Sequence, residues 1–384
     1  MPIRLVIPNE ITPGERRIAL EPGVAKKLVA SGVHIAMQHG AALSAYFKDE
    51  DFTDVEIVAD ATTLYKTADL IFKVQPPTLD ELDQMRDGVT VAGFMAPHLN
   101  AEMMQKMCAK KITSLAMELV PRITRAQSMD ALSSQASISG YMGVLMGARL
   151  ASVFFPMLTT AAGTIRPARV VIIGVGVAGL QAIATARRLG AIVEAYDVRT
   201  ATREQVESLG AKFIDTGVSA DGAGGYAREL TDDEKQQQQD VLAKHIAMAD
   251  VVISTAAIPG RPSPKIISAD MVEAMKTGAV IVDLASEGGG NCELTKPGET
   301  IEYKQRVTIH GPLNVPSELP IHASEMYAKN LFNLLSPFIS ESGELALDLD
   351  DDVIAGCLLT YNGAIVHERY KNTEKNNADK SGAK

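Results

Sequence analysis

Residues 169–197 contain a strand, three spaced glycines, a helix, a second strand and a carboxylate, in that order. Residues 170–173 are all Val or Ile, which is typical of a strand buried on both faces of a parallel sheet. Residues 180–189 are rich in Ala and Leu and stop at Gly190, which predicts a helix with a C-terminal glycine. Residues 191–196 supply the next strand, so we expect one β-α-β unit of a doubly wound fold.

Gly174, Gly176 and Gly179 connect the first strand to the helix with the spacing of a dinucleotide-binding motif. In this motif the first glycine permits a tight turn, the second leaves room for a pyrophosphate, and the third lets helix and strand pack closely. The first turn of the helix then offers N–H groups to the phosphates. Such glycines also mark ordinary strand-to-helix turns, but the flanking strands and helix together favour the dinucleotide interpretation.

Asp197 follows the second strand, 18 residues after Gly179. A carboxylate at this place accepts hydrogen bonds from the adenosine ribose hydroxyls and repels a 2′-phosphate. We therefore expect NAD(H) as the cofactor rather than NADP(H). Arg199 lies close enough in sequence to weaken this preference, but not to reverse it.

The chain has a formal net charge of −10, which argues against a nucleic-acid surface and against a basic patch for anionic lipids. Cys108, Cys292 and Cys357 lack the spacing of a disulfide framework or a zinc site, so we expect a reducing cytoplasm and no metal. The first residues lack the apolar run of a signal peptide. The apolar stretch at 138–155 contains Arg149 and several small residues, which favours a buried helix over a membrane span.

Short apolar runs alternate with helical stretches, which predicts an α/β architecture with parallel sheets covered by helices on both faces. We expect two Rossmann-like domains, each a doubly wound and mostly parallel sheet, joined by long helices with a cleft between them. Residues 1–136 and 322–384 form the discontinuous first domain, and residues 137–321 form the NAD-binding domain. Strands are predicted at residues 4–7, 33–38, 70–74, 89–94, 113–117, 170–173, 191–196, 251–254 and 279–284, with a further candidate at 310–313.

The two joining helices are expected at residues 138–155 and 321–335, and the tail from about residue 371 is expected to be disordered. Residues 215–239 contain several glycines followed by Tyr226, which predicts a long loop beside the nucleotide site. We interpret this loop as a lid that closes over the cofactor, with a solvated surface excursion as the alternative.

Several segments resemble those of the alanine dehydrogenase/transhydrogenase superfamily, over nearly the whole chain. They are Pro8–Glu10, Gly14–Leu20, Phe72–Pro76, Gly174–Gly179, Ile258–Pro262 and Glu287–Asn291. The segment Pro121–Gln135 is similar to a characteristic loop in the NAD(H)-binding component of the transhydrogenase branch, and Gly224–Ala227 is similar to the mobile loop of that branch.

The two branches of this superfamily need different chemistry. Oxidation of an amino acid requires a cation for the substrate carboxylate and an acid/base group that exchanges a proton with the nitrogen. Arg17 could supply the cation, but Gln75 replaces the lysine that contacts substrate in alanine dehydrogenases. Their catalytic histidine falls near Ala96, two positions before His98, and Glu287 stands where they have an aspartate. An alanine-dehydrogenase-like enzyme therefore remains the alternative, beside a non-catalytic NAD sensor.

Resemblance to the transhydrogenase branch implies hydride transfer from NADH to NADP⁺ bound on a partner subunit, coupled to proton translocation by a membrane-spanning component. Such a transfer needs orientation and exclusion of water rather than an acid/base group. The resemblance also implies a homodimer with little or no activity without its partner subunits. It implies a cytoplasmic chain that is peripheral at the inner membrane through those partners.

The same resemblance implies roles for individual residues. Arg122, Gln127, Asp130 and Ser133 would surround the nicotinamide end of NAD(H), with Arg122 and Asp130 paired when the site is empty. A polar interdomain connection is the alternative role for this loop. The remaining cofactor contacts that the resemblance implies are Gly174, Val175, Gly176, Val177, Gly179, Asp197, Val198, Arg199, Gly225, Tyr226, Gln238 and Ala257.

Overall fold

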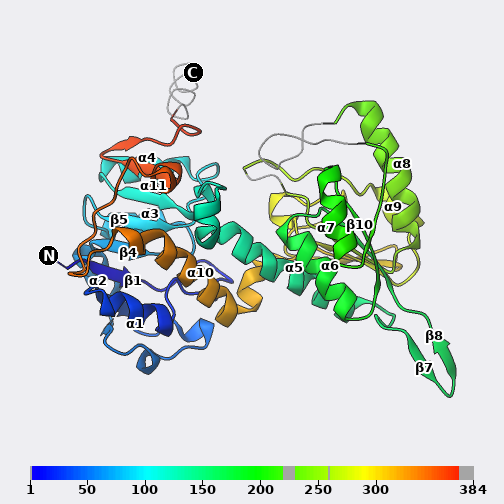
Figure 1. Ribbon diagram of the computed structural model, residues 1–384, viewed down its shortest axis with the longest axis horizontal. Coiled ribbons are helices and arrows are strands. Elements are labelled where there is room, and N and C mark those ends of the chain that lie inside the picture. The colour runs from blue at the N-terminus through cyan, green and yellow to red at the C-terminus, as the bar shows by residue number, and fades with distance from the viewer. Residues whose placement is uncertain (1, 219–229, 258–259, 372–384) are drawn as a thin grey trace. The chain divides into compact units, whose positions relative to one another are not determined.

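The computed structural model describes residues 2–218, 230–257 and 260–371, and the chain divides into two units (Figure 1). Unit 1 comprises Met1–Gln135 and Ser317–Lys384, and unit 2 comprises Ala136–Pro316. The chain passes into unit 2 inside helix α5 (Ala131–Leu150) and returns inside the short 3₁₀ helix η8 (Val315–Glu318).

Unit 1 is built on a mostly parallel sheet. Its described strands are β1 (Arg4–Ile7), β2 (His34–Gln38), β3 (Glu56–Val58), β4 (Leu70–Phe72), β5 (Thr90–Gly93), β6 (Thr113–Ala116), β16 (Leu358–Tyr361) and β17 (Ala364–Ile365). They lie in the order β17-β16-β6-β5-β4-β1-β2-β3. The first six pair in parallel, and β16 and β17 add an antiparallel edge beyond β6.

Helices cover both faces of this sheet (Figure 1). They are α1 (Pro22–Ala30), α2 (Ala61–Thr67), α3 (Leu79–Gln84), α4 (Ala101–Ala109), α10 (Pro320–Leu335) and α11 (Asp352–Cys357). Because successive strand residues point to opposite faces, Leu5 and Ile7 pack in one core and Val6 in the other. The first core takes Tyr327 and Leu331 from α10, so the C-terminal part of the chain completes unit 1.

Unit 2 has a second, mostly parallel sheet. Its described strands are β9 (Arg169–Ile173), β10 (Ile192–Tyr196), β11 (Lys212–Phe213), β12 (Val251–Ser254), β13 (Ala279–Asp283), β14 (Thr300–Tyr303) and β15 (Val307–His310). Their order is β11-β10-β9-β12-β13-β15-β14, with only β14 antiparallel among them. The chain leaves β9 toward β10 and returns on the other side at β12, so the sheet reverses its winding between β9 and β12. Ligands of doubly wound sheets bind at this point, beyond the carboxyl ends of the strands.

Two cores enclose the sheet of unit 2. The helices are α6 (Val177–Arg188), α7 (Arg203–Ser208), α8 (Asp232–Met248) and α9 (Ala269–Ala274). Val170 and Ile172 of β9 pack in the core that contains α6, and Val171 and Ile173 pack in the core that contains α8. Burial on both faces explains why β9 is an uninterrupted run of Val and Ile.

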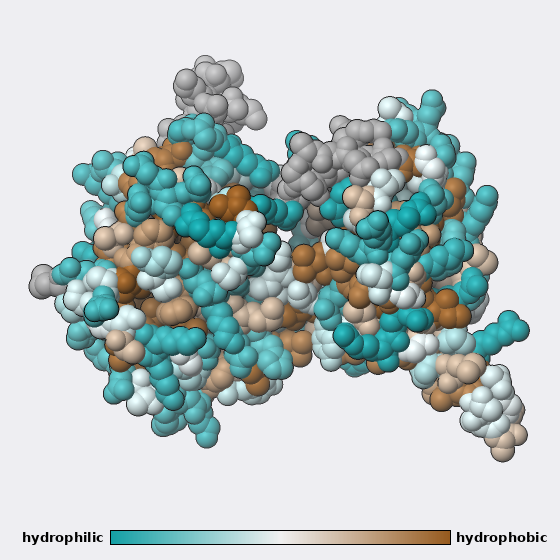
Figure 2. All heavy atoms as spheres, in the orientation of Figure 1, coloured by the Kyte–Doolittle hydropathy of each residue, from teal (hydrophilic) through white to brown (hydrophobic). Residues whose placement is uncertain are grey.

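A hairpin of β7 (Leu158–Thr160) and β8 (Gly163–Ile165) forms a separate two-stranded sheet that extends from unit 2 (Figure 1). Apolar side chains are exposed on the hairpin and just before it, and Figure 2 shows brown and pale surface over this arm. The exposed fraction is 54% for Phe154 and 63% for Met157. The arm leaves apolar surface in water that a second protein surface could cover.

Helix α5 packs against unit 2 through glycines. A Cβ atom on Gly140 would lie 2.0 Å from the carbonyl oxygen of Ala178, at the start of α6. A Cβ atom on Gly143 would lie 2.8 Å from Leu284, and one on Gly147 would lie 2.9 Å from Val251. The small residues that the sequence places in this helix therefore permit close packing on the sheet and on α6.

Several expected elements differ from the observed ones. Helix α5 begins at Ala131 rather than at residue 138, and it ends at Leu150. The last parallel strand, β15, ends at His310 instead of beginning there, because Gly311 and Pro312 follow and proline lacks the N–H that a ladder needs. Helix α10 begins at Pro320, after the return crossing, so it belongs wholly to unit 1 and does not form a second joining helix.

In the part of the chain that the structure describes, no helix combines the length and the apolar composition that a bilayer crossing requires. The predicted lid residues Gly225 and Tyr226, and nearly all of the predicted disordered tail, lie outside the described residues.

We predict that Gly140→Ala destabilises the protein. Alanine normally favours an exposed helix interior over glycine, but here its methyl group would meet the Ala178 carbonyl, and overpacking of this kind costs about 1–3 kcal/mol. Thermal unfolding followed by circular dichroism should show a lower midpoint for Gly140→Ala and little change for Tyr141→Ala, an exposed position on the same helix. An unchanged or higher midpoint for Gly140→Ala would contradict the close contact.

Candidate functional site

The turn after β9 has almost no room for side chains. Gly174 has φ +91°, which favours glycine, and its Cβ atom would lie 2.8 Å from the hydroxyl of Thr255. A Cβ atom on Gly179 would lie only 1.9 Å from the carbonyl oxygen of Gly174. The Thr255 hydroxyl also donates to that carbonyl oxygen at 2.9 Å. The turn is therefore fixed against the end of β12, at the point where the sheet reverses its winding.

Gly176 differs from the other two glycines. It is the N-terminal capping residue of α6, with φ −81° and ψ −166°, a backbone conformation that any residue can adopt. A Cβ atom here would have no heavy atom within 4 Å among the described residues, and Gly176 has no side chain to cap the helix. The fold therefore does not require glycine at this position, whereas a phosphate approaching the helix N-terminus does.

Asp197 lies directly after β10 and is only 7% exposed. Its carboxylate accepts from the backbone N–H of Val175 at 2.7 Å, which joins the end of β10 to the glycine turn. The same carboxylate forms an ion pair with Arg199, whose Nε and Nη2 atoms donate to its two oxygens at 2.8 Å. The predicted ribose acceptor is thus placed beside the turn, and Arg199 is in direct contact with it.

The other predicted cofactor residues of unit 2 lie in different environments. Val175 is buried, Val198 is half-buried, and Val177 is 40% exposed in the first turn of α6. Gln238 is buried on α8, and Ala257 is exposed a few residues after β12.

The four residues predicted for the nicotinamide end lie in unit 1, on the 3₁₀ helix η4 (Thr124–Met129) and its flanks. The Asp130 carboxylate accepts from the backbone N–H of Ser133 at 2.8 Å and from its hydroxyl at 2.6 Å, which is the geometry of an N-terminal helix cap on α5. Arg122 and Gln127 are exposed. Asp130 and Ser133 are therefore in contact with each other, and their bonding accounts for the early start of α5.

Two asparagines of α10 hold this loop, and the sequence analysis did not identify them. Asn330 and Asn333 donate to the backbone carbonyl of Ser128 at 2.9 and 3.0 Å, and Asn330 also accepts from the hydroxyl of Ser134. Asn330 is the buried one of the pair. Buried polar residues in an amphipathic helix are the signal that could have indicated an anchoring role.

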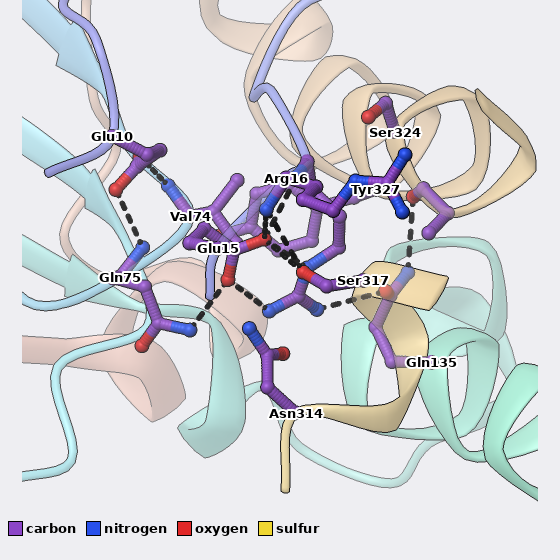
Figure 3. A network of polar contacts seen from close by, with 12 residues as sticks. Glu10, Glu15, Arg16, Val74, Gln75, Gln135, Asn314, Ser317, Ser324 and Tyr327 are labelled. Carbon is purple, nitrogen blue, oxygen red and sulfur yellow. Dashed lines mark hydrogen bonds and ion pairs between the residues drawn. The ribbon is translucent and has the colours of Figure 1, made fainter. Parts of the chain in front are cut away.

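Unit 1 also contains a buried ionic network, shown in Figure 3. Arg17 donates through Nε and Nη2 to the two carboxylate oxygens of Glu15, at 2.8 and 2.6 Å, and through Nη1 to Gln135 at 2.9 Å. Glu15 also accepts from Gln75 at 2.7 Å and from the hydroxyl of Ser317 at 2.6 Å. The guanidinium that could have served as a substrate cation is thus paired with a carboxylate of its own chain.

The charge of Glu15 is strongly stabilised in this network. Burial raises the pKa of Glu15, but the hydrogen bonds and positive charge of Arg17, with hydrogen bonds from Ser317 and Gln75, outweigh it and lower the pKa to about 2. Gln75 replaces the lysine of alanine dehydrogenases and supplies a neutral donor to this carboxylate. The network also engages Gln135 and Ser317, the residues at which the chain leaves and re-enters unit 1.

A second buried ion pair follows β4. Lys73 is 1% exposed, and its Nζ lies 2.7 Å from a Glu81 oxygen and 3.4 Å from a Glu10 oxygen. Glu10 accepts from the backbone N–H of Val74 at 2.6 Å, as Figure 3 shows. The carboxyl end of β4 is therefore held by charges that are compensated within the chain.

The positions that carry the acid and base groups in the alternative enzyme are occupied differently. Ala96 has φ +42°, and Glu118 accepts hydrogen bonds from the backbone N–H groups of Met95 and Ala96. His98 is exposed, and its pKa is lowered by partial burial and by the charge of Arg369. Glu287 is exposed and accepts from the backbone N–H of Asn314 at 2.6 Å.

Asn291 was assigned no role of its own by the sequence analysis. It is fully buried, and its side chain accepts from the backbone N–H of Ala256 at 3.0 Å and donates to the carbonyls of Ala256 and Pro264 at 2.7 and 2.9 Å. The nearby Asp283 is also fully buried and accepts from the hydroxyls of Ser254 and Thr295. Together they fix the segments that follow β12 and β13 at the carboxyl edge of the sheet.

Comparison with known proteins agrees with this architecture. The family model "Alanine dehydrogenase/PNT, N-terminal domain" matches residues 6–139, and "Alanine dehydrogenase/PNT, C-terminal domain" matches residues 143–368. The chain is 44% identical over 377 residues to an NAD(P) transhydrogenase alpha subunit of Rhodospirillum rubrum, covering 95% of this chain and 98% of the relative.

Two further similarities extend over most of the chain. An NAD(P) transhydrogenase alpha subunit of Rickettsia prowazekii is 41% identical over 97% of this chain and 100% of its own length. The crystal structure of transhydrogenase from Sinorhizobium meliloti superimposes with a TM-score of 0.86 at 42% identity, covering 94% of this chain and all of that one. The chain therefore belongs to the alanine dehydrogenase/PNT family, among its NAD(P) transhydrogenase alpha subunits.

Proposed function

We propose that this chain is the NAD(H)-binding subunit of a proton-translocating NAD(P) transhydrogenase, and that it presents NADH to NADP⁺ bound on a partner subunit. Gly176 is the observation that carries this proposal. The surrounding structure leaves space at Gly176 and imposes no unusual backbone angle there, so a bound pyrophosphate is the physical reason for a glycine. When bound, NADH supplies the hydride that the reaction transfers.

The residues of unit 2 fit NAD(H). Gly174, Val175, Gly176, Val177 and Gly179 would bind the pyrophosphate and adenosine at the N-terminus of α6, where the dipole favours an anion. Asp197 would accept from the ribose hydroxyls, with Val198 and Arg199 beside it. Gly225, Tyr226, Gln238 and Ala257 are further proposed contacts.

We assign the loop of unit 1 to the nicotinamide end. Arg122 and Gln127 are exposed polar groups that could orient the carboxamide, and Asp130 and Ser133 are already fixed to each other. Anchoring of the loop by Asn330 and Asn333 would keep these groups in one arrangement. Orientation of the reacting ring is the contribution that direct hydride transfer needs from a protein.

The chemistry of the alternative enzyme is not favoured by these residues. An amino-acid dehydrogenase needs a cation for the substrate carboxylate and a group that exchanges protons with the substrate nitrogen. Arg17 is ion-paired with Glu15, Gln75 is neutral, and Ala96 has no acid/base side chain. Transfer between two nicotinamides requires none of these groups, which supports the transhydrogenase assignment.

We further infer that NADP(H) binds to a partner subunit and that a membrane-spanning component carries the protons. This chain would then lie on the cytoplasmic side, peripheral at the inner membrane through these partners, with little activity by itself. Exposed apolar residues on and before the β7–β8 hairpin support a homodimer in which the arm packs against a second copy.

Rate measurements on the purified chain test the proposed reaction. We expect negligible NADH oxidation with NADP⁺ alone and steady hydride exchange once the NADP(H)-binding and membrane subunits of a transhydrogenase are added. Pyruvate with ammonium should give no NADH oxidation under either condition. Efficient oxidation of NADH by pyruvate and ammonium would instead identify an amino-acid dehydrogenase, and NADH binding without either reaction would indicate a sensor.

We predict that Gly176→Val abolishes NADH binding while the protein stays folded, because the side chain would occupy the proposed pyrophosphate position and meets no protein atom. NADH fluorescence titration should show at least about a hundredfold loss of affinity, with an unfolding midpoint close to that of wild type. The matched change Gly179→Val should lower the unfolding midpoint, because it meets the Gly174 carbonyl. NADH affinity that survives Gly176→Val would contradict the proposed site.

Gln127→Ala should slow hydride exchange by about tenfold or more while NADH affinity changes by less than about threefold, since the amide is proposed to orient the ring rather than to hold the cofactor. Exchange rates at saturating NADH and separate binding titrations distinguish the two effects. Thr124→Ala, also exposed on η4, is the control and should leave both unchanged. A large loss of NADH affinity in Gln127→Ala would count against the assigned role.

A further inference from the structure

The carboxylate of Asp197 has its acceptor positions filled within the chain. A carboxylate accepts about four hydrogen bonds. One comes from the Val175 N–H at 2.7 Å, and three come from Arg199, through its backbone N–H at 2.9 Å and through Nε and Nη2 at 2.8 Å. A ribose hydroxyl that donates to Asp197 must therefore replace one of these donors.

The guanidinium of Arg199 is the donor group that can give way. The Val175 N–H belongs to the backbone of a turn in which Val175 is 1% exposed. The side chain of Arg199 is 25% exposed and extends on a flexible stem. Its Nη2 atom also lies 3.3 Å from the carbonyl of Val175, so the guanidinium sits against the glycine turn itself.

A guanidinium at this place has a second consequence. Arginine binds phosphate oxygens through paired N–H groups, and the 2′-phosphate of NADP(H) is attached to the same ribose whose hydroxyls Asp197 would bind in NAD(H). The bidentate ion pair with Asp197 both neutralises Arg199 and occupies its paired donors.

We propose that Asp197 selects NAD(H) in two ways: it accepts from the ribose hydroxyls, and it holds Arg199 in an ion pair that would otherwise form a 2′-phosphate site. This inference rests on the proposed NAD(H) function. It predicts that discrimination against NADP(H) depends on Arg199 as well as on the negative charge of Asp197.

The neighbouring Arg203 provides a matched control. It lies at the start of α7, where its Nη2 atom is 2.5 Å from the carboxylate of Asp215 and its guanidinium lies over the ring of Phe213. Removal of Arg203 changes the local charge by the same amount as removal of Arg199, but it leaves the group beside Asp197 in place.

The experiment is a titration of NADH and NADPH against full-length wild type, Asp197→Asn, Arg199→Ala, Asp197→Asn/Arg199→Ala and Asp197→Asn/Arg203→Ala. Asparagine keeps one acceptor oxygen for the turn. We expect Asp197→Asn to weaken NADH binding and to tighten NADPH binding by about tenfold or more at low salt. The gain should disappear with Arg199→Ala and persist with Arg203→Ala, and about 0.5 M NaCl should reduce it.

Two results would overturn the inference. If Asp197→Asn gains no NADPH affinity, or if the gain persists without Arg199, simple charge repulsion suffices. If Asp197→Asn does not fold, as judged by circular dichroism, Asp197→Ser takes its place in the same cycle. Arg199→Ala alone provides an independent test, because it should keep NADH affinity within about threefold of wild type. Wild type that binds no NADH would overturn the proposed function itself, which separates the two failures.

Discussion

The contact between Gly179 and the carbonyl oxygen of Gly174 is the constraint on which the nucleotide unit depends. A single methyl group at Gly179 would lie 1.9 Å from that oxygen, so any side chain would push α6 away from the end of β9. Gly140 of α5 approaches the same helix from another element, 2.0 Å from the Ala178 carbonyl by the same measure. Glycines on two helices therefore determine where the N-terminus of α6 lies relative to the carboxyl edge of the sheet.

The two units hold their polar groups in different ways. In unit 1 the buried charges compensate each other, as Glu15 does with Arg17 and Glu81 with Lys73. An isolated buried charge would be expensive, so these pairs must form together with the fold. In unit 2 the turn after β9 is lined by backbone groups, and Asp197 with Arg199 is the charged pair beside it. A site lined by N–H groups suits an anionic cofactor, whereas the compensated charges of unit 1 leave little for a substrate carboxylate.

The sequence predicted the β9–α6–β10 segment well, because each part has an independent local signal. A run of Val and Ile marks β9, glycines mark the turn, and Gly190 with φ +90° ends the helix. The two-domain α/β class followed from the alternation of such segments. The assignment of Pro121–Gln135 rested instead on resemblance, since nothing in its composition indicates a cofactor.

Features that depend on distant contacts could not be predicted in this way. The early start of α5 arises from capping by Asp130, which a polar stretch disguised as a loop. The edge strands β16 and β17 are short and acquire their structure by pairing with β6 and with each other. Asn291 and Asn330 act on backbone groups 27 and 202 residues away, at Pro264 and Ser128, so no local pattern reveals them.

The central claim is that this chain delivers the hydride of NADH to another nicotinamide rather than to a metabolite. The most direct measurement uses NADH that carries deuterium at the transferred position, mixed with the chain, its partner subunits, NADP⁺, pyruvate and ammonium. Mass spectrometry should find the deuterium in NADPH, in proportion to the NADH consumed. Deuterium in alanine, or NADH consumption with no label in NADPH, would contradict the account.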